Sequence, residues 1–470
     1  MDITGKKTST GGLSRRGVLK YGLYGGLATA LGSSLWLIGK RIRQHGGDPN
    51  IILIVMDTTR VDRLGCYGYR RQTTPNLDKL AQESVLYTQA IAPSSWTLPS
   101  HASLFTGKFT TSHGAQTDAD GPLWLTDAVQ DPTIPNLDKN RARGLAKDEV
   151  TLAMTLKDAG YSTGAVVAGP WLKRVFGLDK GFDYYDDNEI STLNGRLAEQ
   201  VTVSAVNWIK KIQQNRFFLF LNYFDPHAPY SPPETFAGAF LPKGTQNPGR
   251  QTTVYEVNAL YDAEVLYMDY HIGKLLDRLK ASNLYDKSWI IVTSDHGELL
   301  GEHGQFWHGH SLYQEEIHIP LFMKYPKGEG SPSRTDLRIQ LTDIFPMICQ
   351  RLGLDTPKNI QGSQPPHITH PIIAETYPLP LISKKGDWRV IFDGDFKFHW
   401  SSKGRHQLFN LKMDPRESIN LTDQHPRWSE KMMTRLNQYL AQLPKPGPTV
   451  PAGKLDKQTR DALKSLGYVE

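Results

Sequence analysis

Four residues in three separate segments have the chemistry needed to cleave an ester. Thr97 offers a hydroxyl, Asp57 offers a carboxylate, and the neighbours Asp295 and His296 offer a carboxylate and an imidazole. Cleavage of a phosphate or sulfate ester requires a nucleophile, a Lewis acid and a group that supplies charge or a proton to the leaving oxygen. These residue types could provide all three if the fold brings the segments together.

The elements that precede the acidic residues predict that the fold does so. Asp57 and Asp295 each come at the end of an uninterrupted apolar run, which is typical of a strand covered on both faces. The carboxyl ends of parallel strands border the crevice in which α/β sheets bind ligands. We therefore expect Asp57, Asp295 and His296 to hold one divalent metal cation, with Thr97 as a further ligand.

The same donor set bears on the identity of the metal. A small number of mixed oxygen and nitrogen ligands favours zinc or manganese, and calcium, which prefers six to eight oxygens, remains the alternative. A metal lowers the pKa of a hydroxyl that it binds. A Thr97 alkoxide could then serve as the nucleophile near neutral pH.

Thr97 also stands where a helix is expected to begin. Pro99 follows two residues later, in the first turn, where a missing N–H costs nothing, so Thr97 is predicted to be the N-cap. The N-terminus of a helix stabilises an anion. Capping alone would explain an isolated threonine before a proline, and only the other candidate residues favour the catalytic interpretation.

Histidines supply the candidate acid and base groups. His227 follows the apolar run 216–224, and His308 and His310 follow the Asp295 segment. We expect these histidines to bind the non-bridging oxygens or to protonate the leaving group. A second metal held by Asp225, His227 and His310 is a less favoured alternative.

Three motifs resemble those of the sulfatases. They are Thr97-Leu98-Pro99-Ser100-His101-Ala102-Ser103-Leu104-Phe105-Thr106-Gly107, Asp225-Pro226-His227-Ala228-Pro229-Tyr230 and Ser294-Asp295-His296-Gly297-Glu298. The segment 57–69 resembles the opening motif of that family. The resemblance implies an alkaline-phosphatase-like α/β/α sandwich with a mostly parallel central sheet. It also assigns Arg60, His101 and His227 to substrate binding.

The chain departs from the sulfatase pattern at four positions. Sulfatases oxidise a cysteine or serine to formylglycine, and Thr97 cannot form that aldehyde by the same route. His101 stands where the family has an arginine, and Thr58 stands where it has a second aspartate. His308 and His310 lie in the region where the family has an active-site lysine. The resemblance is therefore to a sulfatase-like branch of the alkaline phosphatase superfamily in which an unmodified hydroxyl attacks phosphate esters.

These residues predict a metal-dependent ester hydrolase that acts on a phosphate ester through a covalent Thr97 intermediate. Two alternatives stay open: a sulfuric ester hydrolase similar to arylsulfatases, and an inactive binding protein on the same fold. The substrate class is a small-molecule, glycan or lipid ester. The loops that would surround the site carry no motif that narrows it further.

The apolar patterning predicts two folded regions. A catalytic domain is expected over 50–355, a linker over 356–371, and a small antiparallel sheet with one helix over 372–470. Residues 110–147 are expected to form a long surface insertion. The segment 338–352 resembles the helix that closes the large domain in sulfatases, and that resemblance implies one helix there. The two cysteines, Cys66 and Cys349, are expected to be buried thiols.

The N-terminal segment 1–45 has the features of an export signal. Arg15 and Arg16 precede the uncharged stretch 21–39, which is rich in glycine, alanine and leucine. We expect export by the twin-arginine machinery, with the segment either cleaved or kept as a membrane anchor. The protein would then work in the periplasm or on the outer face of the cytoplasmic membrane. The net charge of +6 is too modest to indicate a nucleic-acid partner.

Overall fold

The computed structural model describes residues 47–124, 126, 141–191, 194–212, 215–242, 253–327, 329–378 and 384–447. The chain divides into two units, Met1–Asp48 and Pro49–Glu470. The predicted export segment lies outside the described residues. Among the helices that are described, none is both long enough and apolar enough to cross a bilayer.

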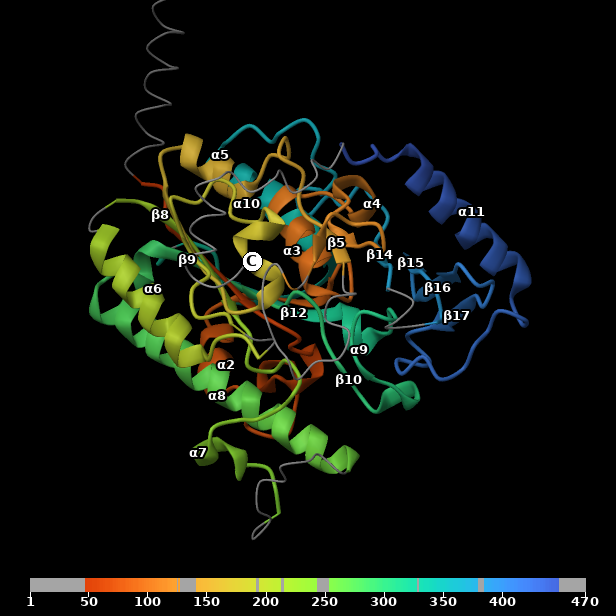
Figure 1. The fold of residues 1–470 in the computed structure, drawn as a ribbon, viewed down its shortest axis with the longest axis horizontal. Coiled ribbons are helices and arrows are strands. Elements are labelled where there is room, and N and C mark those ends of the chain that lie inside the picture. Colours follow the sequence, from red (N-terminus) through yellow and green to blue (C-terminus); the bar gives the residue numbers. More distant parts are fainter. Residues whose placement is uncertain are drawn as a thin grey trace, which may run out of the picture. The chain divides into compact units, whose positions relative to one another are not determined.

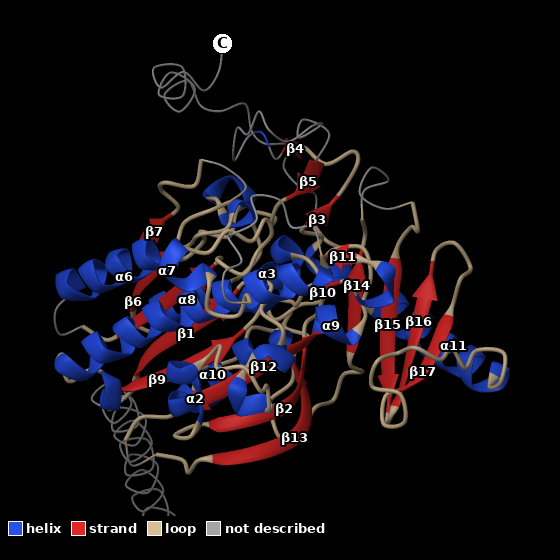
Figure 2. Cartoon of the chain, turned by 90° about the horizontal axis from the view of Figure 1, so that it is seen from below, coloured by secondary structure: helices blue, strands red, loops and turns tan. Residues whose placement is uncertain are grey.

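The centre of the second unit is an eight-stranded sheet with the order β13-β2-β12-β9-β1-β8-β6-β7. Figure 1 labels β8, β9 and β12 of this sheet, and Figure 2 labels its other strands. Its pairs are parallel except for those that β12 makes with β2 and β9. The strands are β1 (Asn50–Met56), β2 (Val85–Ile91), β6 (Ser162–Val166), β7 (Tyr184–Asp186), β8 (Phe217–Tyr223), β9 (Ser288–Thr293), β12 (His318–Lys324) and β13 (Ser333–Gln340). The predicted mostly parallel sheet is confirmed.

Alternate residues of β1 serve two hydrophobic cores, one on each face of the sheet. Leu53 and Val55 pack in one core with α3 (Thr97–Thr106), α5 (Leu152–Asp158) and α10 (Ile344–Leu352). Ile52 and Ile54 pack in the other core with α2 (Pro75–Ala81), α6 (Ala198–Ile212) and α8 (Val254–Ala281). Each of these side chains is fully buried, which is worth about 1.5–3 kcal/mol apiece. The sheet is therefore held rigidly between two helical layers, as the α/β/α prediction requires.

A second, antiparallel sheet follows the large one in the sequence. It has the order β14-β15-β16-β17, and α11 packs against it (Figure 2). The elements are β14 (Ile373–Thr376), β15 (Trp388–Asp393), β16 (Phe396–Ser401), β17 (Gln407–Asn410) and α11 (Pro426–Gln442). This arrangement confirms the small sheet with one helix that the alternating pattern predicts.

Short elements complete the described chain. The hairpin strands β10 (Leu299–Leu300) and β11 (Phe306–Trp307) pair with each other. The short helices are α4 (Thr110–His113), α7 (Glu234–Ala237) and α9 (Gln314–Ile317). The described part of the 110–147 insertion is not structureless, because it contains a three-stranded sheet of β3 (Gln116–Thr117), β5 (Arg141–Arg143) and β4 (Leu123–Trp124).

Two further expectations need correction. The segment 338–352 is not one helix: Arg338 belongs to the edge strand β13, and α10 begins at Ile344. Of the two cysteines, Cys349 is buried and Cys66 only half-buried, and both are free thiols.

Candidate active site

The carboxyl ends of three neighbouring strands bring the predicted residues to one edge of the sheet. β1 lies between β8 and β9 and is parallel to both. Asp57 directly follows β1, His227 lies in the loop after β8, and Asp295 and His296 lie in the loop after β9. The site is therefore at the strand ends where α/β sheets bind ligands.

Asp57, Asp295 and His296 form a compact, fully buried group. One donor atom from each lies within 4.8 Å of the others. Within the described ranges this is the one group of three or more such residues. Oδ1 of Asp57 and Oδ2 of Asp295 are buried without a hydrogen-bond partner. Because an unpaired buried carboxylate oxygen is costly, the group fits a divalent cation that both oxygens would ligate.

Electrostatics agree with that fit. Burial, followed by the nearby charge of Asp295, raises the pKa of Asp57 well above its ordinary value. Burial also raises the pKa of Asp295, to about 6. Two carboxylates buried side by side repel each other, and a divalent cation would remove that penalty.

The other oxygen of each carboxylate is held in place. Asn222 donates to Oδ2 of Asp57 at 3.2 Å. Oδ1 of Asp295 accepts the backbone N–H groups of Thr58 at 3.2 Å and His296 at 2.8 Å. In both residues the oxygen without a partner is thereby left for the cation.

Backbone contacts also set the imidazole of His296. Nδ1 donates to the carbonyl of Gly297 at 2.9 Å, and burial lowers the pKa of the imidazole to about 3. The ring is therefore neutral, with Nε2 unprotonated and able to bind a metal. Gly297 is needed here because a Cβ at that position would collide with the carbonyl oxygen of Glu315.

The hydroxyl of Thr97 lies beside this imidazole, 3.3 Å from Nε2 of His296, in a residue that is 1% exposed. The N-cap prediction for Thr97 is wrong. Trp96 occupies the N-cap position with extended backbone angles, and Thr97 is the first residue of α3. Its hydroxyl makes no capping hydrogen bond and is directed to the metal-ligand group instead.

His101 approaches the same group from within the protein. Its Nδ1 donates to the carbonyl of Thr97 at 2.9 Å and lies 3.5 Å from Oδ2 of Asp295. The ring is fully buried and packs edge-on against Phe220, with centroids 5.8 Å apart. This position suits a residue that holds Thr97 and Asp295 better than one that contacts substrate.

His308 and His227 form a second layer of imidazoles. The ring of His308 lies 4.5 Å from that of His296 and 5.0 Å from that of His227, centroid to centroid. His227 stacks on Phe224 and donates from Nδ1 to the carbonyl of Ala228. Burial lowers the pKa of both His227 and His308 to about 3, so both imidazoles are neutral before substrate binds.

Sequence reasoning missed a carboxylate in this layer. Glu298 is fully buried, and its Oε1 accepts a hydrogen bond from Nδ1 of His308 at 2.9 Å. This bond fixes the tautomer of His308 and leaves Nε2 as the reactive nitrogen. Burial raises the pKa of Glu298 to about 7. Glu298 follows Gly297 in the same motif, so its place next to two candidate ligands was an available signal.

A second missed residue is Asn222. It is an amide near the end of the otherwise apolar strand β8, and that isolated polarity was the available signal. Besides binding Asp57, it accepts the backbone N–H groups of Ala168 and Gly169 at 3.1 and 2.9 Å. Asn222 therefore links the Asp57 carboxylate to the loop after β6.

The structure does not bring the other predicted residues into the group. Nε2 of His310 donates to the carbonyl of Phe306, within its own loop. All three guanidinium nitrogens of Arg60 donate to other groups: the carboxylates of Asp62 and Glu302 and the carbonyl of Glu298. Substrate binding by Arg60 would require these contacts to change.

The alternative second metal site is not assembled among the described residues. Asp225 accepts the N–H of Ala198 at 2.9 Å, and burial raises its pKa to about 7. It forms no ligand group with His227 or His310.

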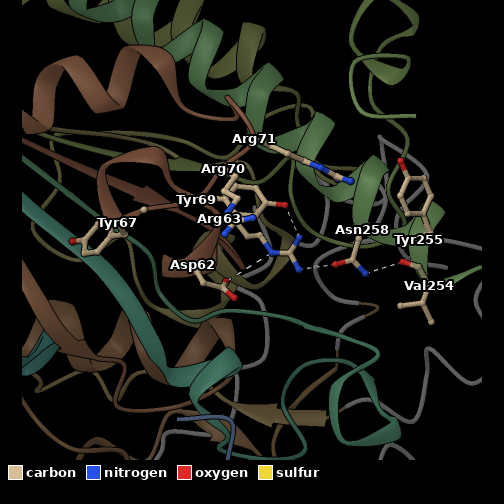
Figure 3. A pocket seen from close by; sticks show the side chains of 10 residues that line it. Asp62, Arg63, Tyr67, Tyr69, Arg70, Arg71, Val254, Tyr255 and Asn258 are labelled. Carbon is tan, nitrogen blue, oxygen red and sulfur yellow. Dashed lines mark hydrogen bonds and ion pairs between the residues drawn. The ribbon is translucent and has the colours of Figure 1, made fainter. Parts of the chain in front are cut away.

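A cavity of about 770 Å³ lies apart from this group and shares no lining residue with it (Figure 3). Asp62, Arg63 and the segment 67–71 line the cavity together with the first turns of α8. Arg63 is the central side chain in the view and donates to Asn258 at 2.6 Å. Arg63 and Arg71 both pair with the buried Asp262. These contacts tie the loop after β1 to α8.

Comparisons with known proteins identify the family. The family model described as Sulfatase matches residues 49–354. The chain is 23% identical to the uncharacterized sulfatase YidJ of Escherichia coli strain K12, over 80% of this chain and 83% of that protein. It is 22% identical to the N-acetylglucosamine-6-O-sulfatase of Bacteroides thetaiotaomicron, over 79% and 82%.

Solved structures share the fold. The phosphonate monoester hydrolase of Agrobacterium radiobacter superposes with a TM-score of 0.67 at 19% identity, covering 87% of this chain and 99% of that one. A structure solved in complex with its substrate D-glucosamine-2-N,6-O-disulfate gives a TM-score of 0.69 at 20% identity, covering 87% and 100%. The family match spans the whole of the large sheet, and these findings lead to one conclusion: the chain belongs to the sulfatase family of ester-hydrolysing enzymes, on an alkaline-phosphatase-like fold.

Proposed function

We propose that this sulfatase-family enzyme hydrolyses or transfers a phosphate ester through a covalent Thr97 intermediate. The observation that carries the proposal is the Thr97 hydroxyl itself, which lies 3.3 Å from Nε2 of His296 instead of capping its helix. A divalent cation held by Asp57, Asp295 and His296 would supply a Lewis acid beside that hydroxyl. Zinc or manganese is favoured and calcium is the alternative.

The proton transfers can be assigned to residues of the chain. When the Thr97 oxygen attacks phosphorus, the bond to the leaving oxygen breaks, and that oxygen needs a proton. We assign the proton for the leaving oxygen to Nε2 of His308, which would take that proton from solvent once the ester binds, while the Thr97 hydroxyl would release its own proton to solvent. In the second step His308 would take a proton from the water that attacks phosphorus opposite Thr97, and the departing Thr97 oxygen would take a proton from solvent. Glu298 stabilises the imidazolium that forms in between.

His227 is placed to assist in the same reaction. Its ring lies 5.0 Å from that of His308, and its Nδ1 is fixed on the Ala228 carbonyl, which leaves Nε2 for the substrate. We assign His227 to the non-bridging oxygens. His310 and Arg60 have no role in this proposal, because Nε2 of His310 is bound to the Phe306 carbonyl and the guanidinium of Arg60 is paired with Asp62 and Glu302.

The threonine decides between phosphate and sulfate in this proposal. A formylglycine hydrate can expel sulfate by breaking its own C–O bond and collapsing to the aldehyde, but a threonine ester has no such exit. Water must instead attack the transferred group, and phosphorus accepts in-line attack when neighbouring groups neutralise its oxygens. The names of the curated relatives favour a sulfate ester, so that substrate class is the competing candidate.

A turnover screen separates these functions. Phosphomonoesters, phosphodiesters and sulfate esters should be offered to purified protein with zinc, manganese or calcium added. Faster turnover of a phosphate ester would support the proposal, and faster turnover of sulfate esters would contradict it. Binding of esters without turnover of any of them would favour the inactive binding protein.

The proposal includes location and domain organisation. Arg15 and Arg16, with the uncharged stretch after them, would direct the protein to the twin-arginine export machinery, and the segment 1–45 would be removed or kept as an anchor. The enzyme would then meet a small-molecule, glycan or lipid ester in the periplasm or at the outer face of the membrane. We retain 50–355 as the catalytic domain, 356–371 as a linker and 372–470 as a subdomain.

A further inference from the structure

Trp307 combines two features that rarely occur together. Its side chain is 63% exposed, and its backbone has a φ of +70°. A bulky residue in the left-handed region is strained, and such strain persists only where the surrounding structure imposes it. An exposed indole contributes little packing that could offset this strain. Packing in the folded protein therefore does not explain why a tryptophan occupies this position, and a functional role would.

The neighbours of Trp307 fix it at the edge of the candidate active site. On one side, β11 pairs with β10, with Trp307 opposite Leu299. On the other side follows His308, whose ring lies in the histidine layer. Gly309 then packs against Trp96, where a Cβ would lie 3.3 Å from the indole ring. Trp96 immediately precedes Thr97. The Trp307 indole is thus carried by the last residue of β11, directly before the acid–base residue His308 and two residues before Gly309, which lies against the neighbour of the nucleophile.

The other exposed aromatic side chains that the structure describes have cationic partners. Arg141 lies over the ring of Trp124 at 4.4 Å, Lys274 over the ring of Tyr270 at 4.9 Å, and Arg71 over the ring of Tyr255 at 5.7 Å. Among the residues that the structure describes, no cation and no aromatic ring packs on Trp307. Its face is available to a ligand.

We propose that Trp307 is a stacking platform for the leaving group, and that the enzyme therefore prefers esters whose leaving group contains a ring. The inference rests on the proposed ester cleavage: the phosphoryl group would lie at Thr97, and the ring of the alcohol would rest on the indole. Sugar rings and aryl rings both present a flat apolar face to tryptophan. An acyclic alcohol has no flat apolar face that could stack on the indole.

The experiment compares KM for three esters: 4-nitrophenyl phosphate, glucosamine 6-phosphate and ethyl phosphate. Trp307→Ala should raise KM for at least one of the two ring-bearing esters roughly three- to tenfold and leave KM for ethyl phosphate within about twofold. Trp307→Phe should keep most of the affinity, and Tyr270→Ala should change none of the three values. If KM rises for only one of the two ring-bearing esters, the result shows whether the platform takes an aryl ring or a sugar ring. Equal losses on all three esters, or no change in any, would overturn the platform.

Binding measurements keep this inference separate from the proposed chemistry. In the Thr97→Ala background, calorimetry with the same three esters should show the same loss of affinity for a ring ester when Trp307→Ala is added. If the wild-type protein turns over no phosphate ester while this loss is seen, the proposed chemistry fails and the platform stands. If the affinity for every ester is unchanged, the platform fails whatever the chemistry.

A matched pair tests the strain on which the argument depends. Trp307→Gly and Trp307→Ala both remove the indole, but only glycine adopts a positive φ freely. The glycine variant should melt at a higher temperature than the alanine variant. Equal melting temperatures would mean that the backbone at position 307 is not strained, and backbone strain would then no longer support a functional role for Trp307.

Discussion

The hydroxyl of Thr97 lies 3.3 Å from Nε2 of His296, although the two residues are 199 positions apart in the sequence. This contact joins the first turn of α3 to the loop after β9. It places the candidate nucleophile beside a candidate metal ligand, at the first residue of α3, where the hydroxyl makes no capping hydrogen bond. The assigned chemistry follows from that placement.

The first prediction concerns the metal. Asp295→Asn should lose most of the roughly one divalent ion that each chain is expected to hold, because Oδ2 of Asp295 is a buried oxygen without a partner in a three-residue ligand group. Elemental analysis of purified protein measures this. Asp225→Asn is the matched control: it changes a buried aspartate at the end of β8 that lies outside the group and should keep the ion. Full retention in Asp295→Asn would refute the ligand assignment.

The second prediction separates two neighbouring histidines. His308→Ala should lower kcat by roughly 10²–10⁴, the usual contribution of a general acid or base. His310→Ala should lower it far less, because Nε2 of His310 is bound to the Phe306 carbonyl. Steady-state kinetics on samples with equal metal content test the pair. Equal losses in both variants would show that the loop acts as a unit and that the assignment to His308 is wrong.

The third prediction concerns Glu298. Glu298→Ala should reduce kcat because Nδ1 of His308 loses its acceptor, and Glu298→Gln should recover part of the loss because its amide oxygen can accept the same hydrogen bond. The loss should be larger for an ester with a poor leaving group, which depends more on proton donation. A uniform loss across leaving groups would indicate a purely structural role for Glu298.

The fourth prediction is a pH dependence of stability far from the metal group. Nε2 of His370 lies 2.7 Å from Oδ1 of Asp343, and its Nδ1 lies 3.0 Å from the carbonyl of Pro371. Burial alone would lower the pKa of His370, but the hydrogen bond to Asp343 and the charge of that carboxylate outweigh it and raise the pKa. Two acceptors on one ring require the imidazolium form.

Because folding raises the pKa of His370, its pairing with Asp343 adds to the free energy of unfolding. This stabilisation is complete below the unfolded pKa of about 6.5 and is lost as the pH rises through the folded pKa. Urea unfolding of the wild type and of His370→Gln at about pH 6 and about pH 9 measures it. At about pH 6 the wild type should have a higher free energy of unfolding than His370→Gln, and this difference should be smaller at about pH 9. A difference that is equal at both pH values would contradict the assignment.

The fifth prediction concerns export. Replacing Arg15 and Arg16 together by lysine keeps the charge but removes the twin arginines that the export machinery reads. The protein should then accumulate in the cytoplasm, which fractionation and immunoblotting would reveal. Unchanged export would mean that the segment acts by another route.

Much of the metal group could be predicted from the sequence. Long apolar runs mark the buried parallel strands β1 and β9, and the residues that follow such strands meet at one edge of the sheet. Asp57, Asp295 and His296 were found in this way. The edge strand β13 gave no such signal, because its exposed residues are charged and polar, as is common where a sheet must avoid pairing with other chains.

The finer details of the site depend on geometry that no spacing reveals. Thr97 has a side chain that could cap a helix and Trp96 does not, so a threonine before a proline turn favoured the wrong residue. Only the extended backbone angles of Trp96 show that it occupies the N-cap position. His308 and His310 are two positions apart in a loop. Only the pairing of β11 with β10 and the contact with Glu298 determine which of them enters the histidine layer.

The most direct test of the account is a search for the covalent intermediate. The enzyme should be mixed with a phosphate ester that it turns over, quenched in acid and digested, and the peptide that contains Thr97 should be weighed by mass spectrometry. We predict a phosphoryl group on Thr97, together with loss of turnover in Thr97→Ala while the fold and most of the metal are retained. Efficient sulfate-ester hydrolysis by the unmodified protein, undiminished in Thr97→Ala and without any phosphorylated peptide, would contradict the central claim.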